Sequence, residues 1–400
     1  MPSAQEDAQA TTRELIPFAA LSAAYFSHIG VVNTFLSLWL KEIGYGVALI
    51  GMIASLQSFS RLVAPYAWAW AGDRTGQRAK LLRIATVLAL LGSLGFFWQG
   101  GGFWWLMACL LFMYLNSSAL MPMSESALAQ IVSRGGVFDV RRHGRVRLWG
   151  SLGFMLTVLA AGAFFENFGL KYFPLAVSLG LALLMWSAFT IPDIREDAAH
   201  AASKQPIWHT LRQPNVAWFF GTIALNVLAH MGLYVFFSLY CDELGYSKTM
   251  IGILWAASVV TEIAWFYTQG RWLPRFSLTA WLIISAAAGA LRFALVAGQG
   301  DVLWILFAAQ TLHAISFAAN HTVCTALISH HFPGSMRSRG QALYTVLGYG
   351  IPGVLGSWAG GLISEAYGLR SVFWIATAVA VLAMLSAWRV WRLQHPATAV

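Results

Sequence analysis

The stretch from Val302 to His330 is apolar enough to cross a membrane, yet it carries polar side chains in its middle. At about 100° per residue of an α-helix, Asn320 lies nearly on the face of His313, and His321 lies within a quarter-turn of it. An imidazole titrates near physiological pH, so His313 could relay protons or donate to a substrate. Because polar groups are costly in lipid, we expect this face to line a protein interior or a water-filled cavity.

Three charged residues lie near the middle of other apolar stretches and could join this group. Arg61, Glu262 and Arg292 stand where an isolated charge would cost at least about 2.5–3.5 kcal/mol, so each must be paired or hydrated. One interpretation is a structural ion pair that fixes helix packing. The favoured one is a site for substrate and protons. Glu262 is the first candidate proton carrier, because burial and a nearby guanidinium act on its protonation in opposite directions.

A second carboxylate and guanidinium lie at the ends of two consecutive apolar stretches. Glu125 is near the end of the fourth stretch, and Arg147 is near the start of the fifth. The two could form a bidentate ion pair, or Arg147 could bind an anionic substrate instead. We therefore assign both residues to substrate binding.

Four further residues are candidates for the substrate site. For Asn320 and His321 the favoured interpretation is an interior polar group with its hydrogen bonds made, and substrate contact is the alternative. Trp255 and Trp265 lie within two turns of Glu262 on its helix and could line an aromatic pocket, although most of the 19 tryptophans suit interfacial anchoring.

The segment after the second apolar stretch contains residues that could form a conformational gate. Asp73, Arg74, Gly76 and Arg78 place a carboxylate and basic side chains around a tight glycine turn. Such a turn can latch to a neighbouring helix end in one conformation and release it in another.

The composition indicates the bilayer as the partner that must surround these residues. Hydrophobic residues make up 58% of the 400 and charged residues only 10%, against about 25% charged in a soluble domain. We predict an all-α membrane protein with twelve transmembrane helices. Their expected ranges are 15–40, 47–71, 79–99, 102–132, 145–166, 170–191, 215–241, 247–270, 277–298, 302–330, 338–365 and 370–393.

The positive charges indicate the orientation of these helices. The net charge is +9, and outside the spans almost all Lys and Arg lie at the termini or in alternate loops. The exceptions are Lys41, Lys171, Lys248 and Arg370. The side of the membrane that is rich in Lys and Arg is therefore cytoplasmic, and it includes both termini. This distribution explains the charge without nucleic-acid binding.

The two halves of the chain repeat each other. The motif Ile43-Gly44-Tyr45 returns as Leu244-Gly245-Tyr246, about 200 residues later, as expected for parallel repeats. At that offset Arg61 stands opposite Glu262. We predict two pseudo-symmetric six-helix bundles, 1–191 and 215–400, joined by a cytoplasmic linker over 192–214 and arranged around a central cavity.

Motifs of several other protein classes are missing from the sequence. It contains no Walker A motif, nucleophile elbow, zinc-ligand spacing or glycine-rich phosphate loop. The three cysteines show no pairing pattern. We expect neither an enzyme nor a metal or cofactor site, and we expect a monomer that uses the proton gradient as its energy source.

The pattern resembles the major facilitator superfamily, and within it the phenylpropionate permease family and lactose permease. The loop Asp73-Arg74-x-Gly76-x-Arg78 is similar to the cytoplasmic signature of the superfamily, although Ala69 and Gln77 depart from it. The closer likeness is carried by Ile50-Gly51 through Arg61, Gly144-Arg145-Val146-Arg147-Leu148-Trp149-Gly150-Ser151, Val260-Thr261-Glu262, Leu291-Arg292, Leu312-His313 with His321, and Val372-Phe373-Trp374.

This resemblance implies proton-coupled uptake by alternating access. It assigns Glu125 and Arg147 to substrate binding, and Glu262, Arg292 and His313 to binding and proton coupling. Lactose permease has a glutamate three residues after that histidine, where this chain has Ser316. Proton carriage would then fall on Glu262 or His313.

The buried arginines outnumber the buried carboxylates, which favours an anionic substrate. The first hypothesis is a proton-coupled importer of a small organic acid, an aromatic one such as a phenylpropionate, in the bacterial inner membrane. A sugar or nucleoside symporter is the alternative. Multidrug efflux is disfavoured because a cationic drug would meet several arginines, and a receptor without transport activity is the remaining possibility.

Overall fold

The computed structural model describes residues 12–132, 139–192, 207–333 and 336–394, and the regular structure in these ranges is entirely helical. Twelve of the segments it describes are long and apolar enough to cross a membrane, so the prediction of an all-α membrane protein with twelve spans is confirmed. These spans are Arg13–Glu42, Val47–Gly72, Arg78–Phe97, Gly102–Ala129, Arg142–Phe168, Leu170–Phe189, Pro214–Glu243, Lys248–Arg275, Leu278–Gln299, Leu303–His331, Arg339–Tyr367 and Leu369–Gln394.

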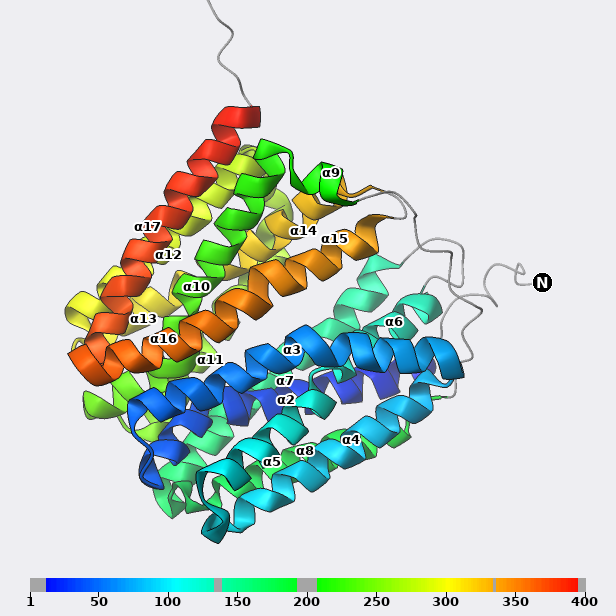
Figure 1. Ribbon diagram of the computed structural model, residues 1–400, viewed down its shortest axis with the longest axis vertical. Helices are drawn as coiled ribbons and strands as arrows, with labels where there is room; N and C mark the ends of the chain where they lie inside the picture. Colours follow the sequence, from blue (N-terminus) through cyan, green and yellow to red (C-terminus); the bar gives the residue numbers. More distant parts are fainter. Residues whose placement is uncertain (1–11, 133–138, 193–206, 334–335, 395–400) are drawn as a thin grey trace, which may run out of the picture. The chain divides into compact units, whose positions relative to one another are not determined.

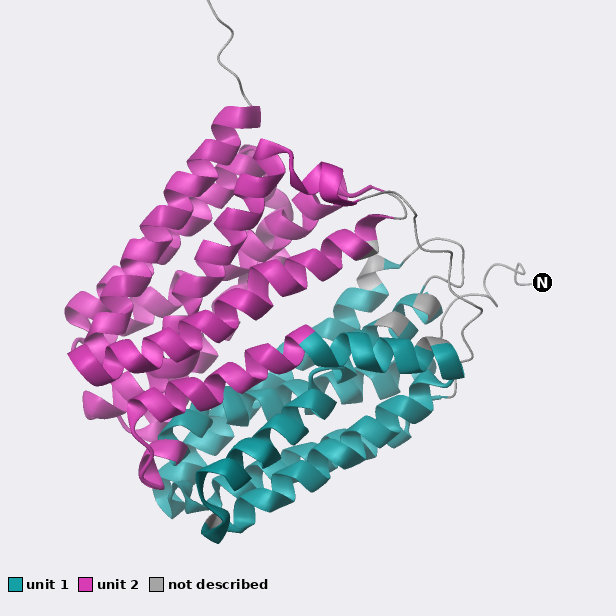
Figure 2. Ribbon diagram, viewed as in Figure 1, with its two compact units in different colours: residues 1–39, 63–199 teal, residues 40–62, 200–400 magenta. Residues whose placement is uncertain are grey.

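The chain divides into two compact units (Figures 1 and 2). Unit 1 comprises residues 1–39 and 63–199, and unit 2 comprises residues 40–62 and 200–400. The first half of helix α3 (Val47–Thr75) therefore groups with unit 2 and its second half with unit 1. The predicted division at the linker 192–214 stays a prediction.

Unit 1 is a bundle of long helices around an aromatic and serine-containing core. Trp39 stacks on Phe173 with ring centroids 4.9 Å apart, and the hydroxyls of Ser93 and Ser178 lie 3.0 Å apart. Besides part of α3, its helices are α2 (Thr12–Glu42), α4 (Arg78–Leu94), α5 (Gly102–Ser117), α6 (Leu120–Val132), α7 (Val140–Phe168) and α8 (Phe173–Phe189), with short 3₁₀ turns η1 (Gly95–Phe97), η2 (Gln99–Gly101) and η3 (Leu170–Tyr172).

Helices α2 and α7 approach each other closely at a glycine. A methyl group at Gly153 would overlap the backbone carbonyl oxygen of Ala23, which no rotamer change can move away. The Ser27 hydroxyl also donates to the Gly153 carbonyl, at 3.2 Å. Small residues at such crossings let helix backbones pack closely in membranes.

We expect Gly153→Ala to destabilise the protein, whereas Gly144→Ala in the same helix should not. Both changes add the same methyl group and gain about 1 kcal/mol of helix propensity. A Cβ at Gly144 has no atom within 4 Å, whereas one at Gly153 requires a backbone shift. Melting temperatures of the two purified variants in detergent test this difference, and equal melting temperatures would contradict the close contact.

Unit 2 is built around α17 (Leu369–Gln394), which packs against both α10 (Pro214–Glu243) and α12 (Leu278–Gln299). Its apolar core includes Phe219, Trp281 and Phe332. The remaining helices are α9 (Ile207–Leu211), α11 (Lys248–Trp272), α13 (Leu303–Thr311), α14 (Asn320–His331), α15 (Arg337–Leu343) and α16 (Ile351–Tyr367), with the short turn η4 (Leu273–Arg275).

Residues 40–62 are held to the rest of unit 2 by polar contacts as well as packing. Lys41 Nζ lies 3.0 Å from Asp242 Oδ2. The Ala48 amide, in the first turn of α3, donates to Glu365 Oε2 at 2.9 Å. A carboxylate there satisfies a backbone donor that the helix itself leaves open, and it complements the positive end of the helix dipole.

Two spans of unit 2 contain π-helical segments. They are η5 (Ala314–Ala319), between α13 and α14, and η7 (Tyr344–Gly350), between α15 and α16. Such segments shift the faces of a helix relative to regular α-helical spacing and are frequent at functional sites. Each also carries aromatic side chains of the candidate site.

Candidate functional site

A chain of four polar side chains crosses the interior of unit 2. Arg292 is fully buried on α12, and its two terminal nitrogens reach His313 Nδ1 at 2.8 Å and Gln310 Oε1 at 2.6 Å. On the other side of the imidazole, His313 Nε2 lies 3.2 Å from Glu262 Oε2. The structure thus brings Glu262, Arg292 and His313 together, as predicted, and adds Gln310.

The contact with Arg292 determines which nitrogen of the His313 ring carries the hydrogen. A guanidinium can only donate, so His313 Nδ1 must accept and cannot carry a proton. The remaining hydrogen of the neutral ring is then on Nε2, the atom that lies 3.2 Å from Glu262 Oε2. While Arg292 keeps this contact, His313 cannot become an imidazolium. Of these two groups, only the Glu262 carboxylate can accept a proton while this contact holds.

The acidic end of this chain is more accessible than its basic end. The Glu262 side chain is 20% exposed, whereas Arg292 has no exposed surface. Among the described residues no carboxylate lies within ion-pair distance of Arg292, because the His313 ring separates it from Glu262. The sequence predicts a guanidinium beside Glu262, whereas in the structure the His313 imidazole lies between Glu262 and Arg292.

An aromatic stack follows His313 along the π-helical segment. The Phe317 ring lies parallel to the His313 ring, with centroids 4.8 Å apart, and nearly parallel to the His321 ring at 6.3 Å. Regular α-helical spacing therefore does not hold here, and His321 rather than Asn320 continues the line from His313. Asn320 is buried, and His321 is exposed. Their substrate contacts stay predictions.

Tyrosines surround the remaining part of this site. The Tyr344 hydroxyl lies 3.3 Å from His321 Nδ1 and 3.2 Å from the Tyr349 hydroxyl, and both tyrosines are on η7. Arg61, half-buried on the part of α3 that belongs to unit 2, interacts electrostatically with Tyr349, and so does Glu262. Arg61 is thus close to the network of Glu262 without forming an ion pair that the structure records.

Unit 1 holds a second cluster, which contains the predicted ion pair. Arg147 Nη1 on α7 lies 3.2 Å from Glu125 Oε1 on α6, so the two residues meet through a single nitrogen rather than as a bidentate pair. The other carboxylate oxygen, Oε2, lies 2.7 Å from His143 Nε2. The Arg147 guanidinium also lies over the Phe26 ring, 5.2 Å from its centroid. The role of the pair in substrate binding stays a prediction.

The two tryptophans predicted near Glu262 are packed inside unit 2. Trp255 is 5% exposed and donates from Nε1 to the Ser238 hydroxyl at 3.1 Å. Trp265 meets Trp281 edge to face, with centroids 5.3 Å apart, within the apolar core. These contacts account for their burial in the structure, so their contribution to an aromatic pocket stays a prediction.

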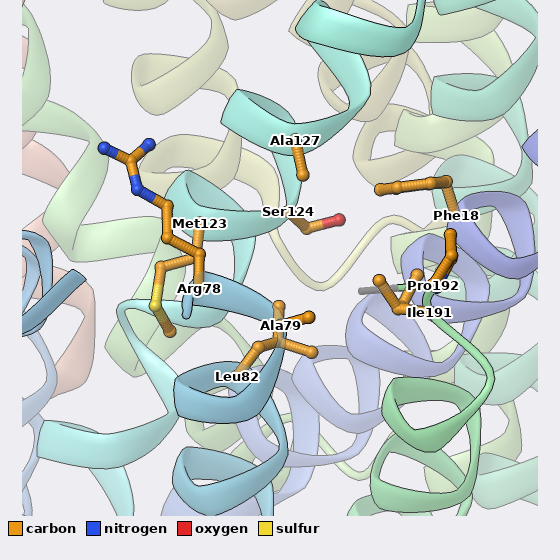
Figure 3. Close-up of a pocket in the computed structure, with 9 residues that line it drawn as sticks. All are labelled: Phe18, Arg78, Ala79, Leu82, Met123, Ser124, Ala127, Ile191 and Pro192. Atoms are coloured by element: carbon orange, nitrogen blue, oxygen red, sulfur yellow. The ribbon is translucent and has the colours of Figure 1, made fainter. Parts of the chain in front are cut away.

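The predicted gating residues span the junction of α3 and α4 in unit 1: Asp73 and Arg74 end α3, Gly76 lies in the turn, and Arg78 begins α4. Gly76 has a φ of 62°, a conformation that favours glycine, and the Arg74 guanidinium lies 4.1 Å from the Trp70 ring centroid. Arg78 lines a small pocket with Met123 and apolar neighbours, and Figure 3 shows its guanidinium directed away from Phe18. The Asp73 side chain lies outside the described residues, and the gating role stays a prediction.

Three members of these clusters were missed at the level of sequence. Gln310 lies three residues before His313, a spacing that puts both on one helix face. His143 lies one turn before Arg147, so it faces the same carboxylate. Phe317 had no such signal, because its place in the stack depends on the π-helical segment.

Comparisons with known proteins support a transporter fold over nearly the whole chain. A model of the MFS_1 like family matches residues 19–375. A probable 3-phenylpropionic acid transporter of Escherichia coli is 28% identical over 362 residues, which is 90% of this chain and 93% of that protein. A maltose permease of Geobacillus stearothermophilus is 28% identical over 376 residues, which is 90% of this chain and 91% of the permease.

Solved structures agree with this fold. A variant of the nucleoside transporter NupG superposes with a TM-score of 0.82 at 16% identity, over 94% of this chain and all of that one. A D-xylose–proton symporter superposes with a TM-score of 0.70, also at 16% identity, over 94% of this chain and 98% of its own. At such identities the likeness concerns the fold alone.

Proposed function

Because the chain belongs to the MFS_1 like family and is a secondary transporter rather than an enzyme, we propose that it imports a small organic acid together with protons. The proposed substrate is an aromatic acid similar to a phenylpropionate, and the proposed mechanism is alternating access. The proposed location is the bacterial inner membrane, with both termini in the cytoplasm and the chain working as a monomer without a cofactor.

The observation that carries the proposal of an acidic substrate is that Arg147 is exposed and only partly paired. Its side chain is 44% exposed, and only Nη1 contacts Glu125. The other donors of a guanidinium stay available for a ligand carboxylate, which is the bidentate partner that this group prefers. The similarity to a probable 3-phenylpropionic acid transporter supports the same substrate class.

The proposal of proton coupling is supported by the network in unit 2. The imidazole between Arg292 and Glu262 cannot take up a proton while Arg292 contacts it, so the carboxyl group of Glu262 is the proposed carrier. A partly accessible carboxylate connected to a fully buried cation can exchange its proton with water when the surroundings open. His313 is proposed to tune this exchange.

We expect Arg147→Gln to weaken binding of 3-phenylpropionate by about thirtyfold or more, since truncating one partner of a hydrogen-bonded charge pair costs about 2–5 kcal/mol. Arg145→Gln, an exposed change on the same helix, is the matched control. Isothermal titration of the purified protein measures both affinities. Unchanged binding in the Arg147 variant would contradict a role for this guanidinium in recognition.

The alternative is a sugar or nucleoside as the substrate. The similarity to a maltose permease and the structural likeness to NupG are the observations in favour of this alternative. Competition experiments separate the two classes. If maltose or uridine binds and carboxylates do not compete, the neutral-substrate alternative replaces the acid. Flux measured in proteoliposomes distinguishes both from a receptor without transport activity.

A further inference from the structure

The Glu125 carboxylate is held by two donors from one helix. His143 Nε2 reaches Oε2 at 2.7 Å and Arg147 Nη1 reaches Oε1 at 3.2 Å, so each oxygen has its own partner. The two donors are one turn apart on α7. Because an ionised carboxylate only accepts, His143 donates through Nε2. The imidazole contact is the shorter of the two.

The start of α7 fixes the position of this histidine. Asp139 is the N-cap residue, and its side chain accepts from the Arg142 amide at 3.0 Å. Its backbone carbonyl accepts from the His143 amide at 3.1 Å. A capped first turn restricts the backbone, and the partial positive charge of a helix N-terminus favours a carboxylate beside it. His143 is therefore positioned by local structure and not by the ligand.

The two donors differ in how accessible they are. The His143 side chain is 26% exposed, against 44% for Arg147, and Arg147 contacts Glu125 through one nitrogen only. Arg147 is thus the donor that an incoming anion can take. Without a second donor, Glu125 would have to give up its only ionic partner for each binding event, and it would compete with the ligand for Arg147.

We propose that His143 is a positioning residue, which retains Glu125 when Arg147 binds the carboxylate of the substrate. This inference rests on the proposed function and adds a third member to the site in unit 1. His143 touches Glu125 and acts through it, so its effect on binding depends on the presence of that carboxylate.

The experiment is a double-mutant cycle on purified, full-length protein with 3-phenylpropionate as the probe. We expect His143→Phe to weaken binding about tenfold, as expected for a lost hydrogen bond to a charged group, while the maximal exchange rate changes less than about twofold. In a Glu125→Gln background the same change should have an effect below about twofold, because no carboxylate then competes for Arg147. His330→Phe is the control.

Two further variants keep the test decisive if the Phe variant does not fold. The amide of His143→Gln can replace Nε2 as the donor and should stay within about threefold of the wild type, whereas His143→Asn is too short and should match the Phe variant. Equal binding by all variants overturns the inference, and so does an equal loss in both backgrounds. If wild-type protein binds no carboxylate at all, the proposed function is overturned together with it.

Discussion

Glu262→Gln should abolish accumulation of substrate under a pH gradient while leaving exchange intact. The amide imitates the protonated carboxyl group permanently, so the loaded carrier can still reorient, but no proton can be released from this position. Wild-type protein with one proton per substrate should approach about tenfold accumulation for one pH unit. The variant should show no net uptake above that of protein-free liposomes, because a carrier that cannot release its proton cannot return empty.

Proteoliposomes with an alkaline interior and labelled 3-phenylpropionate outside provide the measurement, and counterflow in preloaded vesicles measures exchange. Protein-free liposomes correct for passive entry of the neutral acid. Glu243→Gln, which neutralises an exposed acid at the end of α10, is the matched control. If Glu262→Gln accumulates substrate normally, Glu262 is not the carrier. His313→Gln then decides whether the imidazole takes this role or whether the network is not coupled to protons.

Arg292→Gln should destabilise unit 2 and stop uptake. The guanidinium supplies donors to both His313 Nδ1 and Gln310 Oε1, and it has no exposed surface. Removing one partner of a buried charged cluster costs about 3–5 kcal/mol. The loss also frees His313 Nδ1 to take up a proton, so that an imidazolium would face Glu262 and hold it ionised. Transport should therefore fail even in the fraction that folds.

The variant Arg292→Lys separates the effect of the positive charge from the effect of the planar shape of the guanidinium. The ammonium keeps the positive charge but lacks the planar fork that reaches two acceptors at once, so we expect a stability between those of wild type and the Gln variant. Melting temperatures and uptake rates are measured side by side, with Arg275→Gln, an exposed cation over Trp272, as the control. Wild-type behaviour of the Lys variant would show that bridging His313 and Gln310 is unnecessary.

The two clusters, one in each unit, combine carboxylate, imidazole and guanidinium groups in different orders. In unit 1 the carboxylate of Glu125 lies between a histidine and an arginine, whereas in unit 2 the imidazole of His313 lies between an arginine and a carboxylate. Each unit thus combines the same three residue types in a different order. The order with the carboxylate in the middle suits anion exchange at Arg147, and the order with the imidazole in the middle suits proton exchange at Glu262.

The amino-acid sequence by itself determined the membrane class, the twelve spans and the charged residues of both clusters except His143. Apolar stretches of more than about 18 residues have no stable soluble alternative, and charged residues within them must find partners. Arg61, Glu262, Arg292 and His313 were recognisable for that reason. The positions of Glu125 and Arg147 at adjacent helix ends made their contact one of two alternatives, and the structure shows it through a single nitrogen.

Only the tertiary structure decided which atoms meet. Regular helical spacing placed Asn320 beside His313, but the π-helical segment η5 rotates the following residues and brings Phe317 and His321 into line instead. It also decided that His313 bridges Arg292 to Glu262 and that His143 shares Glu125 with Arg147. A sequence pattern specifies which face of a helix is polar. Backbone irregularities and the packing of one helix on another determine which partner that face meets, and these depend on contacts between residues far apart in the chain.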